Sequence, residues 1–128
     1  QKEDPYYLYV KAVLMFEKKQ YDEVNTVCDK IIAIGGELAA EAYAKKADCY
    51  FWPAQAIVEE NSTLSIEDPK YNTNEEKIKA LYEQAKPLYE KAKELEPDNK
   101  NIWGQFLLNI YWKLNKAEYE ALEKEMGY

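Results

Sequence analysis

Apolar residues near the start of the chain recur every three or four positions, which is the spacing of one buried face of an α-helix. The first such stripe consists of Leu8, Ala12 and Met15. Asp4 and Pro5 precede it, and this pair is typical of a helix start because aspartate can cap free N–H groups and proline fits the first turn. The pattern therefore predicts a helix from about residue 5 to residue 19.

A second apolar stripe begins at Tyr21 and predicts a returning helix that ends at Gly35 and Gly36. Glycine favours such an end because it takes the left-handed backbone conformation without steric cost. The two helices would form a hairpin over residues 5–36. A third stripe starts near residue 38, and its members are Tyr43, Ala47 and Tyr50. Ala47 is the small residue that would let a partner helix approach closely.

Residues 52–74 interrupt this order with Pro53, a second proline and several Asn, Ser and Thr residues. Such residues mark turns and loops, so the pattern predicts an insertion at 52–74. Its first part would continue the third helix beyond Pro53, and its second part would be a loop. Thr73 followed by Glu76 resembles a capping box, which predicts that the next helix covers about 74–96.

Two further helices are predicted after Asp98, which can cap the first of them. The buried face of that helix would consist of Trp103, Phe106, Leu107 and Ile110. The other helix covers about 116–126 and is rich in glutamate, as expected for the polar cap at the end of a solenoid. Strand-like alternation is not sustained anywhere in the sequence. The chain is therefore predicted to form one all-α domain over residues 1–128.

The segment from Ala85 to Pro97 has small, aromatic, small and proline residues at fixed intervals. These residues are Ala85, Tyr89, Ala92 and Pro97, with Trp103 following. The pattern resembles the tetratricopeptide repeat family, whose unit is a helical hairpin of about 34 residues. The resemblance implies antiparallel helical hairpins stacked as a short right-handed α-solenoid. Repeat 1 would cover 5–36, repeat 2 would cover 38–97 with the insertion 52–74, and repeat 3 with a C-terminal cap would cover 98–128.

In the tetratricopeptide repeat family the first helix of each repeat lines a concave face, and the resemblance implies the same arrangement here. The matching positions selected as partner-binding residues are Tyr6, Tyr9, Val13, Phe16, Asp48, Phe51, Leu108 and Tyr111. Aromatic side chains bury large apolar areas in such contacts. We therefore expect a non-catalytic interaction scaffold that binds a peptide or protein segment on this face. The alternative is a self-associating structural module whose aromatic face is buried in a homodimer or under its own insertion.

The chain has 24 acidic and 17 basic residues, a net charge of −7, and contains no arginine and no histidine. This charge argues against nucleic-acid binding, which depends on basic side chains that neutralise phosphates. Without arginine and histidine, the chain lacks a bidentate anion-binding group and a proton shuttle that works at neutral pH. Because no acid, base and nucleophile converge, we expect no enzyme activity, no catalytic residue, no metal and no cofactor.

Cys28 and Cys49 lack the spacing of a zinc or redox motif, so we expect free buried thiols or, alternatively, a disulfide between neighbouring helices. The triplet at Asn61 matches the N-glycosylation pattern, which short sequences often match by chance. No apolar run approaches the length of a membrane span. The sequence begins at Gln1 without methionine, which is compatible with removal of an upstream segment. We expect an extracytoplasmic bacterial protein, periplasmic or secreted, with a cytoplasmic protein as the alternative.

Overall fold

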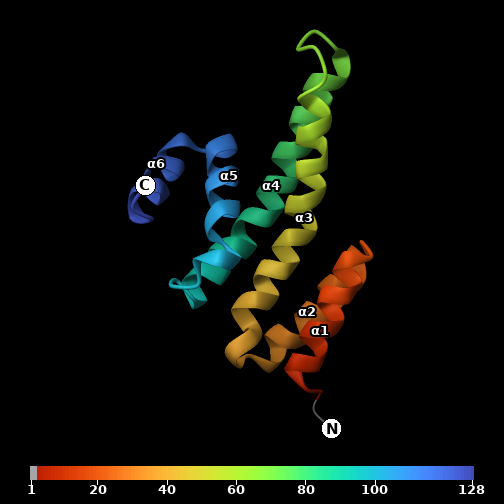
Figure 1. Ribbon diagram of the computed structural model, residues 1–128, viewed down its shortest axis with the longest axis vertical. Coiled ribbons are helices and arrows are strands. Elements are labelled where there is room, and N and C mark those ends of the chain that lie inside the picture. Colours follow the sequence, from red (N-terminus) through yellow and green to blue (C-terminus); the bar gives the residue numbers. More distant parts are fainter. Residues whose placement is uncertain (1–2) are drawn as a thin grey trace.

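The computed structural model describes residues 3–128, which form six α-helices, two short 3-10 helices and no β-strand (Figure 1). The α-helices are α1 (Pro5–Glu17), α2 (Tyr21–Ile34), α3 (Ala39–Asn61), α4 (Pro69–Leu95), α5 (Gly104–Leu114) and α6 (Lys116–Glu125). The 3-10 helices, η1 (Gly36–Leu38) and η2 (Lys100–Ile102), lead into α3 and α5. The prediction of an all-α chain is confirmed. Over the described range, no helix has both the length and the apolar character that a membrane crossing requires.

α3 and α4 form a long hairpin at the centre of the molecule, and shorter helices pack on either side of it (Figure 1). α2 packs against α3, and α1 contacts both α2 and α3. On the other side, α5 packs against α4, and α6 packs against α5. Figure 1 shows the upper end of the α3–α4 hairpin extending beyond the other helices. Each helix therefore packs mainly against its neighbours in the sequence.

Several helix ends lie where the sequence predicts them. Asp4 caps α1, because its side-chain oxygen accepts a hydrogen bond of 2.9 Å from the backbone N–H of Tyr6. α2 ends at Gly35, whose φ of +78° is the left-handed value that favours glycine. The sixth helix, predicted at 116–126, is observed at Lys116–Glu125. Local capping chemistry is thus sufficient to fix these ends.

The start of the fifth helix differs from the prediction. Asp98 does not cap it, because η2 intervenes and α5 begins at Gly104. The indole N–H of Trp103 donates a hydrogen bond of 3.0 Å to the backbone oxygen of Glu96, just beyond the end of α4. Trp103 is fully buried in this position. A tertiary contact of the tryptophan, rather than a cap by Asp98, therefore accompanies the turn between α4 and α5.

The predicted insertion at 52–74 is mostly helical. α3 continues through Pro53 to Asn61, and α4 begins at Pro69, so the loop is shorter than predicted. The capping box predicted at Thr73 is wrong, because Asp68 caps α4 by accepting a hydrogen bond of 2.9 Å from the backbone N–H of Lys70. Thr73 lies inside the helix. Its hydroxyl donates to the backbone oxygen of Pro69, as a helix-interior threonine can.

Two buried asparagines join the far ends of α3 and α4. The Asn74 side-chain amide donates a hydrogen bond of 2.9 Å to the Asn61 side-chain oxygen. The Asn61 amide nitrogen donates to the backbone oxygen of Tyr71 at 3.1 Å and to a Glu75 carboxylate oxygen at 3.2 Å. Glu75 also pairs with Lys113 of α5. The distal hairpin is therefore tied to the helices below it, and the nitrogen that N-glycosylation would modify is engaged inside the fold.

The apolar core has two parts that meet at α3. One part lies between α1, α2 and α3, and its largest fully buried aliphatic residues are Leu8, Val24 and Ile31. The other lies between α3, α4, α5 and α6 around the aromatic rings of Phe51, Tyr89 and Trp103. The small residues of the predicted repeat pattern, Ala47, Ala85 and Ala92, are each fully buried in this second part. The core is closely packed at these three positions, so a larger side chain would find no room there.

Candidate protein-binding face

Four of the predicted binding residues share one face of α1, on the side toward α3. They are Tyr6, Tyr9, Val13 and Phe16, which recur at the spacing of a helical stripe. The Tyr6 hydroxyl donates to the carboxylate of Glu37 in η1. The ammonium group of Lys45 in α3 lies 4.7 Å from the centre of the Phe16 ring. Tyr6 is 55% exposed, and the other three are half-buried. The structure thus brings this part of the predicted site together.

Asp48 of α3 links this stripe to α4. One of its carboxylate oxygens lies 3.4 Å from the Lys45 ammonium, and the other accepts a hydrogen bond from the Tyr89 hydroxyl. Burial raises the pKa of Asp48, whereas the hydrogen bond from Tyr89 and the charge of Lys45 lower it. Both oxygens have partners within the chain. In this arrangement Asp48 holds Lys45 and Tyr89 in position.

Neutral hydroxyls and carboxylates lie next to each other along the same face. Burial, with smaller contributions from the charges of Glu41 and Asp48, raises the pKa of Tyr9 to about 12. Burial also raises the pKa of Glu41; the charge of Glu96 raises it further, and Lys45 lowers it. Tyr9 therefore keeps its proton at neutral pH and presents an apolar ring with a polar hydroxyl.

The remaining predicted residues lie in the second core. Phe51 is 2% exposed, and its ring centre lies 5.7 Å from that of Tyr82 and 5.1 Å from that of Phe106. Leu108 and Tyr111 are also buried, and the Tyr111 hydroxyl donates to Glu90. The partly open edges of Leu108 and Tyr111 line two separate hollows between α5 and its neighbours. The structure does not bring these three side chains to the face of α1.

Trp52 lies in the predicted insertion and is not among the predicted binding residues. It is 47% exposed and lines a hollow of about 530 Å³ between the start of α2 and the second half of α3. The lining residues are Lys19, Tyr21, Trp52, Pro53, Gln55, Ala56 and Glu59. The sequence does contain a signal that places Trp52 on the same face of α3 as Asp48. One stripe at spacings of three and four runs through Glu41, Lys45, Asp48 and Trp52.

This hollow continues the stripe of α1. The ring of Phe16 lies 5.6 Å from that of Tyr21, which lines the hollow. Trp52 is supported from behind by Phe51 at 5.4 Å and by Phe106 at 6.2 Å. We use the name aromatic track for the surface formed by Tyr6, Tyr9, Val13, Phe16, Tyr21 and Trp52.

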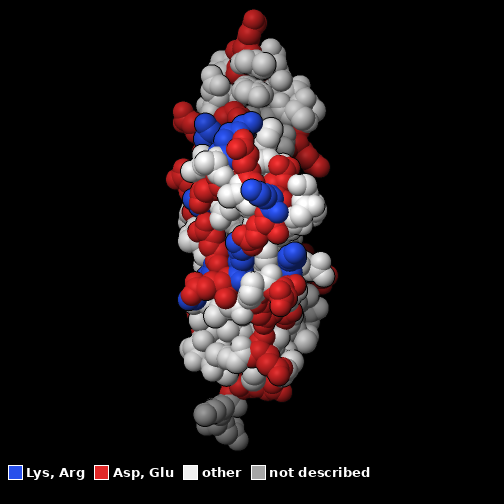
Figure 2. Space-filling view, turned by 90° about the vertical axis from the view of Figure 1, so that its left-hand side faces the viewer, with Lys and Arg blue, Asp and Glu red and all other residues white. Residues whose placement is uncertain are grey.

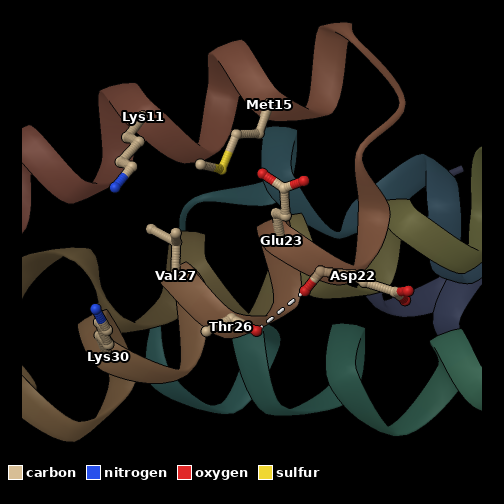
Figure 3. Close-up of a pocket in the computed structure, with 7 residues that line it drawn as sticks. All are labelled: Lys11, Met15, Asp22, Glu23, Thr26, Val27 and Lys30. Carbon is tan, nitrogen blue, oxygen red and sulfur yellow. Dashed lines mark hydrogen bonds between the residues drawn. The ribbon is translucent and has the colours of Figure 1, made fainter.

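A second, shallower hollow of about 300 Å³ lies on the other side of α1, between α1 and α2 (Figure 3). Figure 3 shows Met15 and Val27 facing each other across it, with charged side chains at its edges. The lining residues are Lys11, Met15, Asp22, Glu23, Thr26, Val27 and Lys30. Thr26 donates a hydrogen bond of 3.1 Å to the backbone oxygen of Asp22 and so remains within its own helix.

No group of three or more Cys, Asp or Glu side chains in residues 3–128 is arranged to hold a metal ion. Cys28 and Cys49 are free and buried, and burial is the main cause that raises the pKa of each thiol to about 12. A scan against protein-family models finds no match for the chain, and searches of the curated proteins and of the solved structures find no significant match.

Proposed function

We propose that the chain is a non-catalytic scaffold that binds a protein segment along the aromatic track. The observation that carries the proposal is Trp52, a large ring that is 47% exposed in a hollow of about 530 Å³. Tryptophan and tyrosine in partly enclosed positions are the side chains that contribute most to protein interfaces. The neighbouring rings of Tyr21 and Phe16 extend this surface to the C-terminal end of α1.

The fold supports a scaffold of the tetratricopeptide kind, with helical hairpins stacked as a right-handed α-solenoid. Consecutive helices pair as hairpins, and the first helices of two successive hairpins, α1 and α3, contact each other. Alanines sit at the buried positions that the repeat pattern assigns to close packing. In such an arrangement the first helices form one continuous surface, and the aromatic track lies on it except for Tyr21, which belongs to α2.

The partner that this surface favours is an extended or helical segment with apolar anchors and basic flanking residues. The rings would accept the apolar anchors. Carboxylates of Glu37, Glu41 and Glu59 border the track or line its hollow, and the chain carries a net charge of −7. Complementary charge on the partner would speed its association and orient it.

The polar groups near the track are paired with one another, which favours a binding surface over a catalytic site. Asp48 and Lys45 are paired with each other, and Asp48 also accepts the hydrogen bond from Tyr89. The thiols of Cys28 and Cys49 are buried with raised pKa values, so they remain protonated at neutral pH and are poor nucleophiles.

The test uses peptides selected on the 128-residue protein from a displayed random library. Their affinities are then compared for the wild type, Trp52→Ala and the matched control Trp112→Ala, since Trp112 is 56% exposed but lies on α5 outside the track. Trp52→Ala should weaken binding by about tenfold or more, which corresponds to ~1.4 kcal/mol. Trp112→Ala should leave the affinity unchanged.

Two results would contradict the proposal. One is full affinity in Trp52→Ala, and the other is a loss of affinity in Trp112→Ala that equals or exceeds the loss in Trp52→Ala. Circular dichroism spectra of both variants must match the wild type, because only then does a change in affinity report the removed contact.

A further inference from the structure

A hollow between α5 and α6 shares no lining residue with the aromatic track. Its volume is about 320 Å³, at the lower end of the range for small-molecule sites. Trp112 and Tyr128 border it and are 56% and 68% exposed. The lining residues are Gln105, Leu108, Asn109, Trp112, Tyr119 and Tyr128. Large rings that are open to solvent around one hollow indicate a place where another molecule binds.

The lining of this hollow is neutral. None of its six residues carries a charge, whereas Lys19 and Glu59 line the hollow at Trp52. Figure 2 shows acidic side chains and lysines spread over the face that carries α6. A charged ligand would lose water in the hollow without gaining an ion pair from its lining, so the lining favours a neutral ligand.

Two of the rings are held in place by their neighbours. The ring centres of Trp112 and Tyr119 lie 5.1 Å apart, with the planes inclined at 69°. The Lys116 ammonium lies 4.0 Å from the centre of the Trp112 ring, and the Tyr119 hydroxyl donates a hydrogen bond of 3.0 Å to Glu123. Rings that are already fixed lose little conformational freedom when a ligand binds, which favours affinity.

Polar groups of defined direction lie beside the rings. Gln105, Asn109 and Trp112 follow one another at helical spacing along α5, over about 10 Å. The Asn109 amide nitrogen donates to the backbone oxygen of Gln105 at 2.9 Å, and the Gln105 amide nitrogen donates to the Tyr128 hydroxyl at 3.2 Å. Both bonds use the amide nitrogens, which leaves the two side-chain oxygens as acceptors and the proton of the Tyr128 hydroxyl as a donor.

This combination matches the chemistry of a sugar ring. A pyranose presents a face of C–H groups, which packs on an aromatic ring, and a rim of hydroxyls, which donate to amide oxygens and accept from a phenol. An apolar peptide side chain would cover the rings but leave the amide oxygens without partners. We propose that the hollow between α5 and α6 binds a neutral sugar, as a pyranose unit of a saccharide. The site is separate from the aromatic track and stands independently of the proposed peptide binding.

An NMR titration of the ¹⁵N-labelled protein tests the proposal. The chain has three tryptophans, so three indole N–H signals report on three positions, and Trp52→Phe and Trp112→Phe assign them. The probes are maltose, cellobiose, lactose, mannobiose and di-N-acetylchitobiose, each added up to about 50 mM. At least one of them should shift the Trp112 signal along a saturating curve with a Kd of about 0.1–10 mM. The signals of Trp52 and Trp103 should stay in place.

Variants locate the binding. Trp112→Ala, followed through the backbone signal of Tyr128, should raise the Kd for the sugar by about tenfold or more, because the ring is removed. Asn109→Ala, followed through the Trp112 indole, should raise it by about threefold or more, because one acceptor is lost. Trp52→Ala is the matched control: Trp52 is 47% exposed but lies outside this hollow, so the sugar affinity should stay within about twofold. Circular dichroism verifies that each variant is folded.

Three results would overturn the proposal. The first is a Trp112 signal that no neutral disaccharide shifts over the whole concentration range; a selected peptide that shifts it instead would assign the hollow to a protein partner. The second is full sugar affinity in Trp112→Ala, because the sugar would then use another surface. The third is tighter binding of the acidic disaccharide digalacturonate than of every neutral one, because the site would then select a charged ligand.

Discussion

Phe51 offers the sharpest test of how the predicted aromatic residues divide between core and surface. Its ring is 2% exposed and packs against aromatic rings from α3, α4 and α5. The nearest ring centres are those of Phe106 at 5.1 Å, Trp52 at 5.4 Å, Tyr82 at 5.7 Å and Tyr89 at 6.1 Å. Phe51→Ala would therefore open a cavity at the junction of three helices and leave four rings without a common neighbour.

The expected cost follows from these contacts. Removing a buried phenylalanine side chain costs about 3–5 kcal/mol, a range that includes the cavity left behind. Aromatic pairs contribute about 0.5–1.5 kcal/mol beyond the buried area, which favours the upper part of that range for a ring with four aromatic neighbours. Stability of a domain of this size is about 5–15 kcal/mol in total. Phe51→Ala should thus remove a large fraction of it without changing the helical fold.

Urea denaturation followed by circular dichroism measures this loss. The midpoint should fall while the dependence on urea concentration stays the same, because the surface exposed on unfolding is little changed. Phe16→Ala is the control, since Phe16 is half-buried and lies on the aromatic track. Its cost should stay below about 1.5 kcal/mol, and its main effect should be on peptide binding. A loss below about 1 kcal/mol for Phe51→Ala, or equal losses for both variants, would refute this assignment.

Three further outcomes are expected. Ala47→Leu should overpack the second core and cost about 1–3 kcal/mol in urea melts, whereas Leu at the exposed Ala80 should cost little. Asn61→Ala should leave the buried Asn74 amide without its acceptor, cost about 1–3 kcal/mol and speed hydrogen exchange at the hairpin tip. Because burial raises the pKa of the cysteine thiols from 9.0 to about 12, unfolded thiols ionise first, so the free energy of unfolding should fall as pH rises through this interval.

Periodicity within single helices predicts much of the fold. The stripes of α1 and α2 lie where the sequence indicates, because each stripe must face a neighbour to leave water. The capped start at Asp4 and the glycine end at Gly35 are equally local. The α1 part of the candidate face is predictable for the same reason, since residues 6, 9, 13 and 16 lie on one side of any helix that contains them.

The distal hairpin is less predictable because local signals there compete. Proline usually ends or kinks a helix, yet Pro53 lies within α3 and is half-buried in the packed hairpin. Asp68 and Pro69 form a helix start as good as the one at Asp4, but the loop-forming residues around them favour a later start. The pairing of Asn61 with Asn74 decides the register, and a contact between distant residues has no local signature.

The division of aromatic residues between core and surface also depends on packing between helices. Phe51 and Trp52 are adjacent in the sequence, and either one fits a stripe on α3. The rings of Tyr82, Tyr89 and Phe106 enclose Phe51, and α1 ends at Glu17, which leaves Trp52 open to the hollow. Sequence spacing cannot separate these two positions, because an apolar ring at helical spacing serves a core and a binding face equally well.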